Sequence, residues 1–86
     1  MKKLIQKYIN KITVTDVEMF AINNNIKLNK NETSAIYSVL KEHYNNLLYG
    51  NSEIALNILK NKLSNENYNK VYSLFMKYKE KYNNYL

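Results

Sequence analysis

The chain contains one histidine, His43, which is the first candidate for acid–base or metal chemistry. A general base needs a nucleophile to activate and an acidic residue to orient it, and the sequence offers no such set. A metal ligand needs partners such as a second histidine or cysteines, and the sequence has neither. His43 lies between Leu40 and Leu47 at the edge of an apolar helical stripe, and Glu42 is expected to face elsewhere. We therefore expect a half-buried structural histidine.

Paired carboxylates are the second kind of group that could catalyse a reaction. The chain has only seven acidic residues, and none is embedded in the kind of apolar run that surrounds catalytic carboxylates. Asp16 and Glu18 lie close together, but their position suits the start of a helix. The absence of cysteine excludes thiol nucleophiles and disulfides, and the single glycine, Gly50, excludes a glycine-rich phosphate loop. We expect a protein that is not an enzyme and that holds no cofactor or metal.

All 13 basic residues are lysines, and the formal net charge is +6. A basic excess favours polyanionic partners such as nucleic acid, but lysine lacks the two-pronged grip of arginine on phosphate and guanine. The abundance of Lys, Asn, Tyr and Ile also fits A/T-rich codon usage, which would explain the charge without a function. The candidate phosphate contacts are Lys3, Lys7, Lys11, Lys27, Lys30, Lys70, Lys77 and Lys81.

Nine tyrosines are the last residues with a recognisable binding chemistry. Those near the C-terminus could stack nucleobases beside the lysines, but their spacing is that of a core face, where the ring is buried and the hydroxyl stays in water. Tyr49 and Tyr85 fall off the apolar stripe or near the chain end and are the best candidates for exposed contact.

The elements that position these residues are expected to be helices, because proline is absent and apolar residues recur with helical periodicity. A chain of 86 residues is long enough for one domain and too short for two. We expect an all-α, compact single domain over residues 1–86, a bundle of about five short helices. The expected helices cover residues 2–12, 14–24, 30–49, 53–63 and 65–83.

Helix boundaries carry capping signals. Thr15 and Glu18 have the spacing of a capping box, and Asn29 and Glu32 repeat it before the third helix. The run Asn23–Asn25 should end the second helix, because asparagine tolerates the left-handed conformation. Ile26 and Leu28 should pin the link that follows to the core. The inner helix faces are expected to comprise Leu4, Ile5, Tyr8, Ile9, Ile12, Val17, Phe20, Ala21, Ile36, Tyr37, Leu40, Tyr44, Leu47, Leu48, Tyr68, Val71, Tyr72, Phe75, Tyr78 and Tyr82.

The helix expected at 53–63 is apolar over about 200°, with Ile54 and Ile58 on one side and Leu56 and Leu63 nearly opposite. Such a helix is either sandwiched between neighbours or covers a partner. A core of this size would also gain stability from dimerisation. The candidate protein interface comprises Tyr49, Leu56, Leu63 and Tyr85.

Two segments of the sequence resemble those of a known family: INKITVTDVEMFAINNNIKLNKNETSAIYSVL from residue 9 and LLYGNSEIALNILKNKLSNENYNKVYSLFMKY from residue 47. Over about residues 4–80 the chain resembles the YqfT-like family of small uncharacterised proteins from low-GC Gram-positive bacteria. Asn29, where the family has Thr, and the Lys/Tyr-rich tail depart from its pattern. The resemblance implies an intracellular helical domain with no assigned activity and no functional residues to carry over. The matching positions are Ile12, Thr13, Phe20, Ala21, Ile26, Leu28, Glu32, Ile36, Leu59, Val71, Leu74 and Phe75.

Residues 13–40 are also similar in outline to SAP-like nucleic-acid modules, which consist of a helix, an extended link and a second helix. That resemblance implies phosphate contacts from Lys27, Lys30 and the amides that open the third helix.

Apolar runs of only a few residues predict no membrane span, and the basic N-terminus lacks the apolar region of a secretory signal. A cytoplasmic location is therefore expected. The function predicted is a small interaction module that acts by protein–protein contact or self-association. A nucleic-acid-associated protein, such as a phage-borne or plasmid-borne regulator, is the alternative. No small-molecule substrate is indicated, and the partner and process stay open.

Overall fold

The computed structural model of the chain describes residues 2–49 and 51–83. Over these residues it contains five helices and no strand, which confirms the all-α bundle. Each expected helix agrees with the observed one to within one residue at either end. The helices are α1 (Lys2–Lys11), α2 (Val14–Asn23), α3 (Lys30–Tyr49), α4 (Glu53–Lys62) and α5 (Asn65–Asn83).

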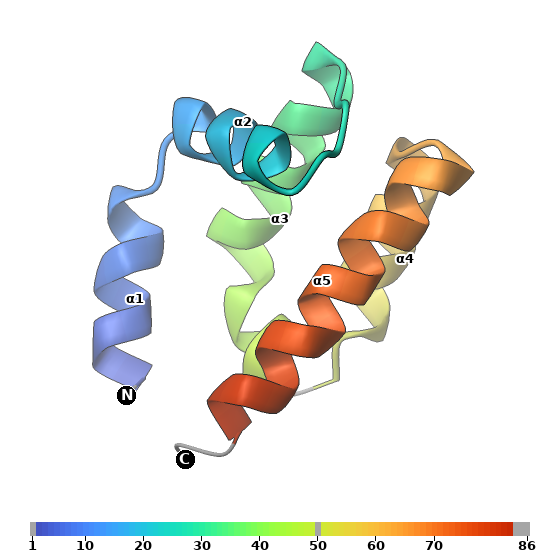
Figure 1. Cartoon of the computed structure of the whole chain (residues 1–86). Helices are drawn as coiled ribbons and strands as arrows, with labels where there is room; N and C mark the ends of the chain where they lie inside the picture. Colours follow the sequence, from blue (N-terminus) through green and yellow to red (C-terminus); the bar gives the residue numbers. More distant parts are fainter. Residues whose placement is uncertain (1, 50, 84–86) are drawn as a thin grey trace.

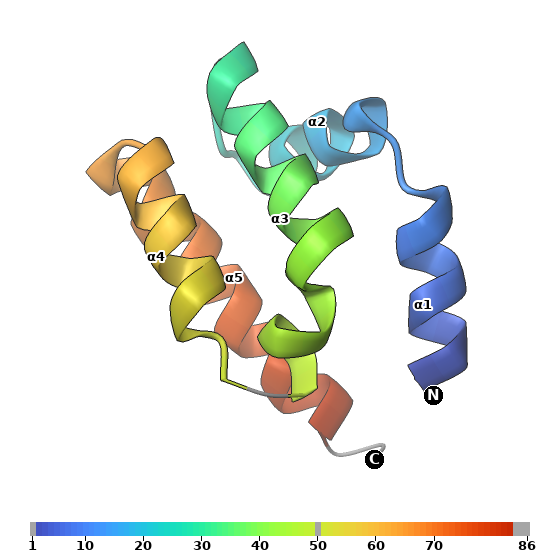
Figure 2. The same cartoon turned by 180° about the vertical axis from the view of Figure 1, so that it is seen from behind.

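The long helix α3 is the centre of the fold, because it contacts each of the other four helices. Figure 1 shows α2 crossing one end of α3, with α1 on one side and the α4–α5 pair on the other. The reverse view in Figure 2 places α3 between α1 and α4. Within the described residues, the backbone of α1 approaches α3 and no other helix. Helix α1 is therefore a peripheral element packed on one side only.

The main core lies between α3, α4 and α5. Its buried cluster joins Val39 and Leu47 of α3 to Ala55 and Leu59 of α4 and to Leu63, which follows α4. Val39, only 2% exposed, was not among the residues expected to face inward. It stands beside the Ile36–Leu40 stripe, so the buried face of α3 is rotated from the expected face towards α4.

A second set of buried residues holds α1 and α2 against α3: Ile9, Ile12, Val17, Ala21 and Ile26. These were all expected to be inward. Tyr72 of α5, 38% exposed, was expected to be inward, and that prediction was wrong. Tyr8, 65% exposed, and Phe20, 42% exposed, were also expected to be inward, and that prediction was wrong as well. The physical reason is that α1 and α2 each pack their backbone against α3 alone, so the flanks of their apolar stripes stay uncovered.

The N-cap of α2 is Thr13, two residues before the expected cap Thr15. The Thr13 side-chain oxygen accepts from Asp16 N at 3.2 Å, and the Asp16 carboxylate accepts from Thr13 N at 2.9 Å, which makes a complete capping box. The predicted Thr15–Glu18 box is therefore wrong. Helix α1 ends at Lys11, and the extended backbone of Thr13 (φ −118°, ψ 167°) precedes the first residue of α2, Val14.

The asparagine run ends α2 as predicted. Asn25 has a positive φ of 60°, and Ile26 N donates to Ala21 O at 2.8 Å across the reversed chain. The Asn24 side-chain amide donates to Phe20 O at 2.8 Å, which satisfies a carbonyl at the helix end.

Candidate functional site

The groove between α3 and α4 contains the histidine. It has a volume of about 460 Å³, and Ser34, Ser38, Glu42 and His43 are among its lining residues. The backbone of His43 leaves the helical region (φ −126°, ψ 15°) and kinks α3. Glu42 Oε2 lies 3.9 Å from His43 Nε2, and both residues line the groove, so the expectation that Glu42 faces elsewhere was wrong.

The groove does not assemble a nucleophile with a base. No hydrogen bond joins His43 to Ser34 or Ser38 in the described part of the chain, although all three side chains line the groove. Residues 2–49 and 51–83 also hold no group of three or more His, Asp or Glu side chains that could bind a metal ion. His43 is half-buried, as expected from its place at the edge of the apolar stripe.

Among the side chains that the structure describes, the most buried titratable group is Glu32, which has three hydrogen-bond donors around it. Its Oε1 accepts from Asn29 N at 3.1 Å and from the Asn67 side-chain amide at 3.0 Å, and its Oε2 accepts from Ser64 N at 2.8 Å. Asn67 also donates to Lys27 O at 2.8 Å. Glu32 is 4% exposed, and Asn67 is also buried. We call Asn29, Glu32, Ser64 and Asn67 the polar cluster.

The polar cluster lowers the pKa of Glu32 below its ordinary value of 4.5. Burial alone would raise this pKa, but hydrogen bonds from the Ser64 and Asn29 backbone and from the Asn67 side chain together outweigh it. The carboxylate completes the cap of α3, which begins after Asn29, and accepts the N–H of Ser64, which precedes α5. Its role is structural, because it fastens the starts of two helices together.

The lysines named from the sequence come from three separate places. Lys7 and Lys11 lie on α1, and Lys27 and Lys30 lie at the link between α2 and α3. The other three lie on α5: Lys70, Lys77 and Lys81. The Lys70 amine is 3.4 Å from the Glu66 carboxylate, so its charge is partly balanced. The side chain of Lys3 lies outside the described residues.

Two residues of the expected interface, Leu56 and Leu63, are covered to different degrees. Leu63 is 6% exposed and belongs to the core cluster, and Leu56 packs against that cluster. The burial of Leu63 leaves it unsuited to direct contact with a partner in this fold, whereas Leu56 is half-buried and its assignment stays a prediction. The wide apolar arc of α4 serves instead to place the helix between α3 and α5. Tyr85 and the side chain of Tyr49 lie outside the described residues.

Exposed apolar side chains gather instead on α1 and α2. Of the eight large hydrophobic side chains exposed in the described residues, five lie between positions 8 and 22: Tyr8, Val14, Met19, Phe20 and Ile22. On α2, a rotation of about 100° per residue puts Met19 and Ile22 opposite the buried Val17 and Ala21. Met19 is 50% exposed and Ile22 is 64% exposed. We call Met19 and Ile22 the outer face of α2.

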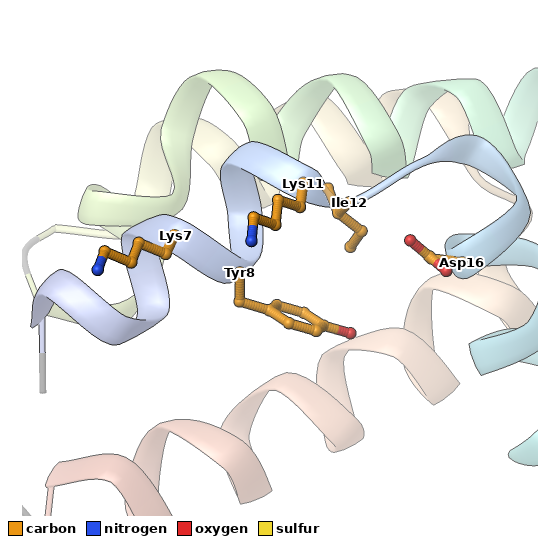
Figure 3. Close-up of a pocket in the computed structure, with 5 residues that line it drawn as sticks. All are labelled: Lys7, Tyr8, Lys11, Ile12 and Asp16. Carbon is orange, nitrogen blue, oxygen red and sulfur yellow. The ribbon is translucent and has the colours of Figure 1, made fainter.

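A small pocket lies beside this segment, between α1 and the start of α2. It has a volume of about 290 Å³ and is lined by Lys7, Tyr8, Lys11, Ile12 and Asp16. Figure 3 shows Tyr8 and Ile12 projecting from α1 towards the end where Asp16 lies, with Lys7 and Lys11 following one another along the helix. We call this the α1 pocket. Sequence reasoning had singled out the two lysines but had placed Tyr8 in the core.

Comparisons with protein-family models, with curated proteins and with solved structures gave no match. The YqfT-like and SAP-like resemblances therefore stay predictions. Within the described residues, no helix combines the length and the apolarity needed to cross a membrane.

Proposed function

We propose that this chain is a small, non-enzymatic, cytoplasmic interaction module that works by contact with a protein partner or with a second copy. The observation that carries the proposal is the outer face of α2, where Met19 and Ile22 point away from the core. Surface hydrophobic residues scattered singly need no explanation, but a helix that buries one side and keeps apolar residues on the other indicates a contact surface.

The energetic argument concerns what a partner would cover. Burying a large aliphatic side chain contributes about 1.5–3 kcal/mol relative to leaving it exposed. Met19 and Ile22, with the neighbouring Val14 and Phe20, form a concentrated source of such area on one short segment. The backbone of α2 packs in the described residues only on α3, so Met19 and Ile22 stay exposed, whereas the Phe20 ring is partly covered by that of Tyr78.

The test uses two isoleucines that match in exposure. Ile22→Glu places a charge on the outer face of α2, and Ile54→Glu places one on α4, where Ile54 is 61% exposed. The full chain is used to capture partners from a nuclease-treated extract of the cells that make it, and light scattering follows self-association over a range of concentrations.

We expect Ile22→Glu to lose the captured protein or the concentration-dependent dimer, and Ile54→Glu to keep it. Capture that persists in Ile22→Glu would contradict the proposal. So would capture that disappears in the unsubstituted chain after nuclease treatment, because the nucleic-acid alternative predicts that result.

A further inference from the structure

Helix α1 has an unbalanced charge. Its ten residues, KKLIQKYINK, include four lysines and no acidic residue. Lys7 and Lys11 are exposed one helical turn apart, an arrangement in which like charges repel. Neither forms an ion pair with any residue that the structure describes, whereas Lys70 on α5 has Glu66. The two positive charges at the α1 pocket are therefore available to an anionic partner.

The floor of the α1 pocket is apolar although its rim is charged. Tyr8, a residue that is 65% exposed, contributes an aromatic ring, and Ile12 contributes the aliphatic base. The apolar strip continues along α2, because Phe20 lies one turn after Asp16 and its ring contacts that of Tyr78 with centroids 5.9 Å apart. A volume of about 290 Å³ accommodates a single large side chain rather than an extended ligand.

We propose that the α1 pocket receives an acidic amphipathic segment of a protein partner. An apolar side chain of that segment enters beside Tyr8 and Ile12, and carboxylates one turn away pair with Lys7 and Lys11. This assignment rests on the proposed function and specifies the chemistry of the partner. It selects a different protein rather than a second copy, because two chains of net charge +6 would bring like charges together.

Asp16 sets the direction in which the segment lies. Its carboxylate is held in the cap of α2 by Thr13 N and stands at the far end of the pocket from Lys7. A carboxylate of the partner is attracted by Lys7 and Lys11 and repelled by the Asp16 carboxylate. The acidic end of the segment therefore lies along α1, and its apolar or basic end lies towards α2.

Apolar neighbours favour a protein segment over a nucleic acid. Interfaces with nucleic acid are more polar than those with protein, and the exposed Phe20, one turn after Asp16, would contribute little against a phosphate backbone. The chain also has no arginine with which to hold phosphates in two-pronged fashion.

The experiment selects binders to the full chain from a displayed library of random 12-residue peptides. Binders are then measured against Lys7→Gln/Lys11→Gln and against Lys77→Gln/Lys81→Gln. The second pair is a matched control, since its lysines are exposed at the same spacing on α5 and their removal changes the net charge equally. Tyr8→Ser tests the pocket floor at an exposed position, where the fold should tolerate it. A single-stranded oligothymidylate of about 12 nucleotides is the nucleic-acid probe.

We expect acid-rich peptides with one apolar anchor, whose affinity falls about tenfold in the α1 double variant and much less in the α5 control. Added salt should weaken this binding. Peptides that are neutral or basic, an equal loss in both double variants, or tighter binding of the oligothymidylate would overturn the proposal, as would a failure to select any peptide. Neutral peptides together with extract capture lost in Ile22→Glu would reject only the acidic partner and keep the proposed function.

Discussion

The carboxylate of Glu32 accepts hydrogen bonds from residues that are more than 30 positions apart in the chain. Its local partner is Asn29, three residues before it, and its distant partners are Ser64 and Asn67. A buried carboxylate with donors on both oxygens is stabilising, whereas the same site with one donor left unpaired is destabilising. Glu32 therefore couples the start of α3 to the start of α5.

Replacing Glu32 by Gln should lower the free energy of unfolding by about 2–3 kcal/mol. The amide keeps one oxygen acceptor, but its NH₂ group would face a donor of Ser64 or Asn29. Urea unfolding followed by circular dichroism measures the change. Glu18→Gln, at an exposed carboxylate on α2, is the control and should change stability by less than about 0.5 kcal/mol. Equal changes in the free energy of unfolding of Glu32→Gln and Glu18→Gln would show that the polar cluster contributes nothing to stability.

Stability should also fall in acid because of Glu32. Its folded pKa lies below the ordinary value of 4.5 through the hydrogen bonds described above, so the folded state favours the charged form. The contribution is complete above about pH 4.5 and is lost as the pH falls through the lower folded pKa. Melting temperatures from pH 6 to pH 2.5 should drop more in the unsubstituted chain than in Glu32→Gln. A parallel drop in both proteins would assign the acid sensitivity to other carboxylates.

At the scale of the element, the start of α2 shows how much of a helix boundary can be predicted from the local sequence. Thr13 and Thr15 both precede acidic residues at the capping spacing, so local sequence alone offers two boxes. The choice depends on where α1 stops, and α1 stops at Lys11, with Thr13 in the extended conformation of a cap. By contrast, the Asn29–Glu32 pair was predictable, because a single candidate cap follows the asparagine run.

Thr13→Ala should destabilise the protein by about 1 kcal/mol, because it removes the acceptor for Asp16 N. Thr15 lies two residues later and is exposed, so the free energy of unfolding of Thr15→Ala should be within about 0.5 kcal/mol of that of the unsubstituted chain. Thermal unfolding of the two variants side by side makes the comparison. A larger loss in Thr15→Ala would restore the cap first expected from the sequence.

At the scale of the whole molecule, the helices were predictable and their exposed faces were not. Periodicity places apolar residues on a face, but it does not say how many neighbours cover that face. Helix α4 is packed between α3 and α5, so its wide apolar arc is buried at Leu63 and half-buried at Leu56. The backbones of helices α1 and α2 pack on α3 alone in the described residues, so Tyr8 remains exposed and Phe20 is only partly covered, by the ring of Tyr78.

The candidate site was predictable only in part for the same reason. Lys7 and Lys11 were visible as a basic ridge, but the pocket beside them requires the turn between α1 and α2 to bring Asp16 next to Tyr8 and Ile12. The polar cluster depends on contacts between residues 32 and 67, which leave no signal in local sequence. Long-range packing decides both features.

Leu56→Glu should act on the fold rather than on an interface. Leu56 packs against the core cluster, so the substitution should lower the free energy of unfolding by about 1.5–3 kcal/mol. Ile54→Glu, at an exposed position of the same helix, should have little effect. Denaturant unfolding at low protein concentration, where a dimer would dissociate, distinguishes a loss of core packing from a loss of dimerisation. A fully stable Leu56→Glu variant would contradict the packing of α4.

The most direct test of partner contact through α2 compares the oxidation of two methionines by dilute hydrogen peroxide. Met19 lies on the outer face of α2 and is 50% exposed, and Met76 lies on α5 and is 42% exposed, so each should react in the isolated chain. In the complex recovered by capture, mass spectrometry of proteolytic fragments should show Met19 protected several-fold and Met76 still oxidised. Equal oxidation of Met19 with and without the partner, or protection of Met76 alone, would contradict contact through α2.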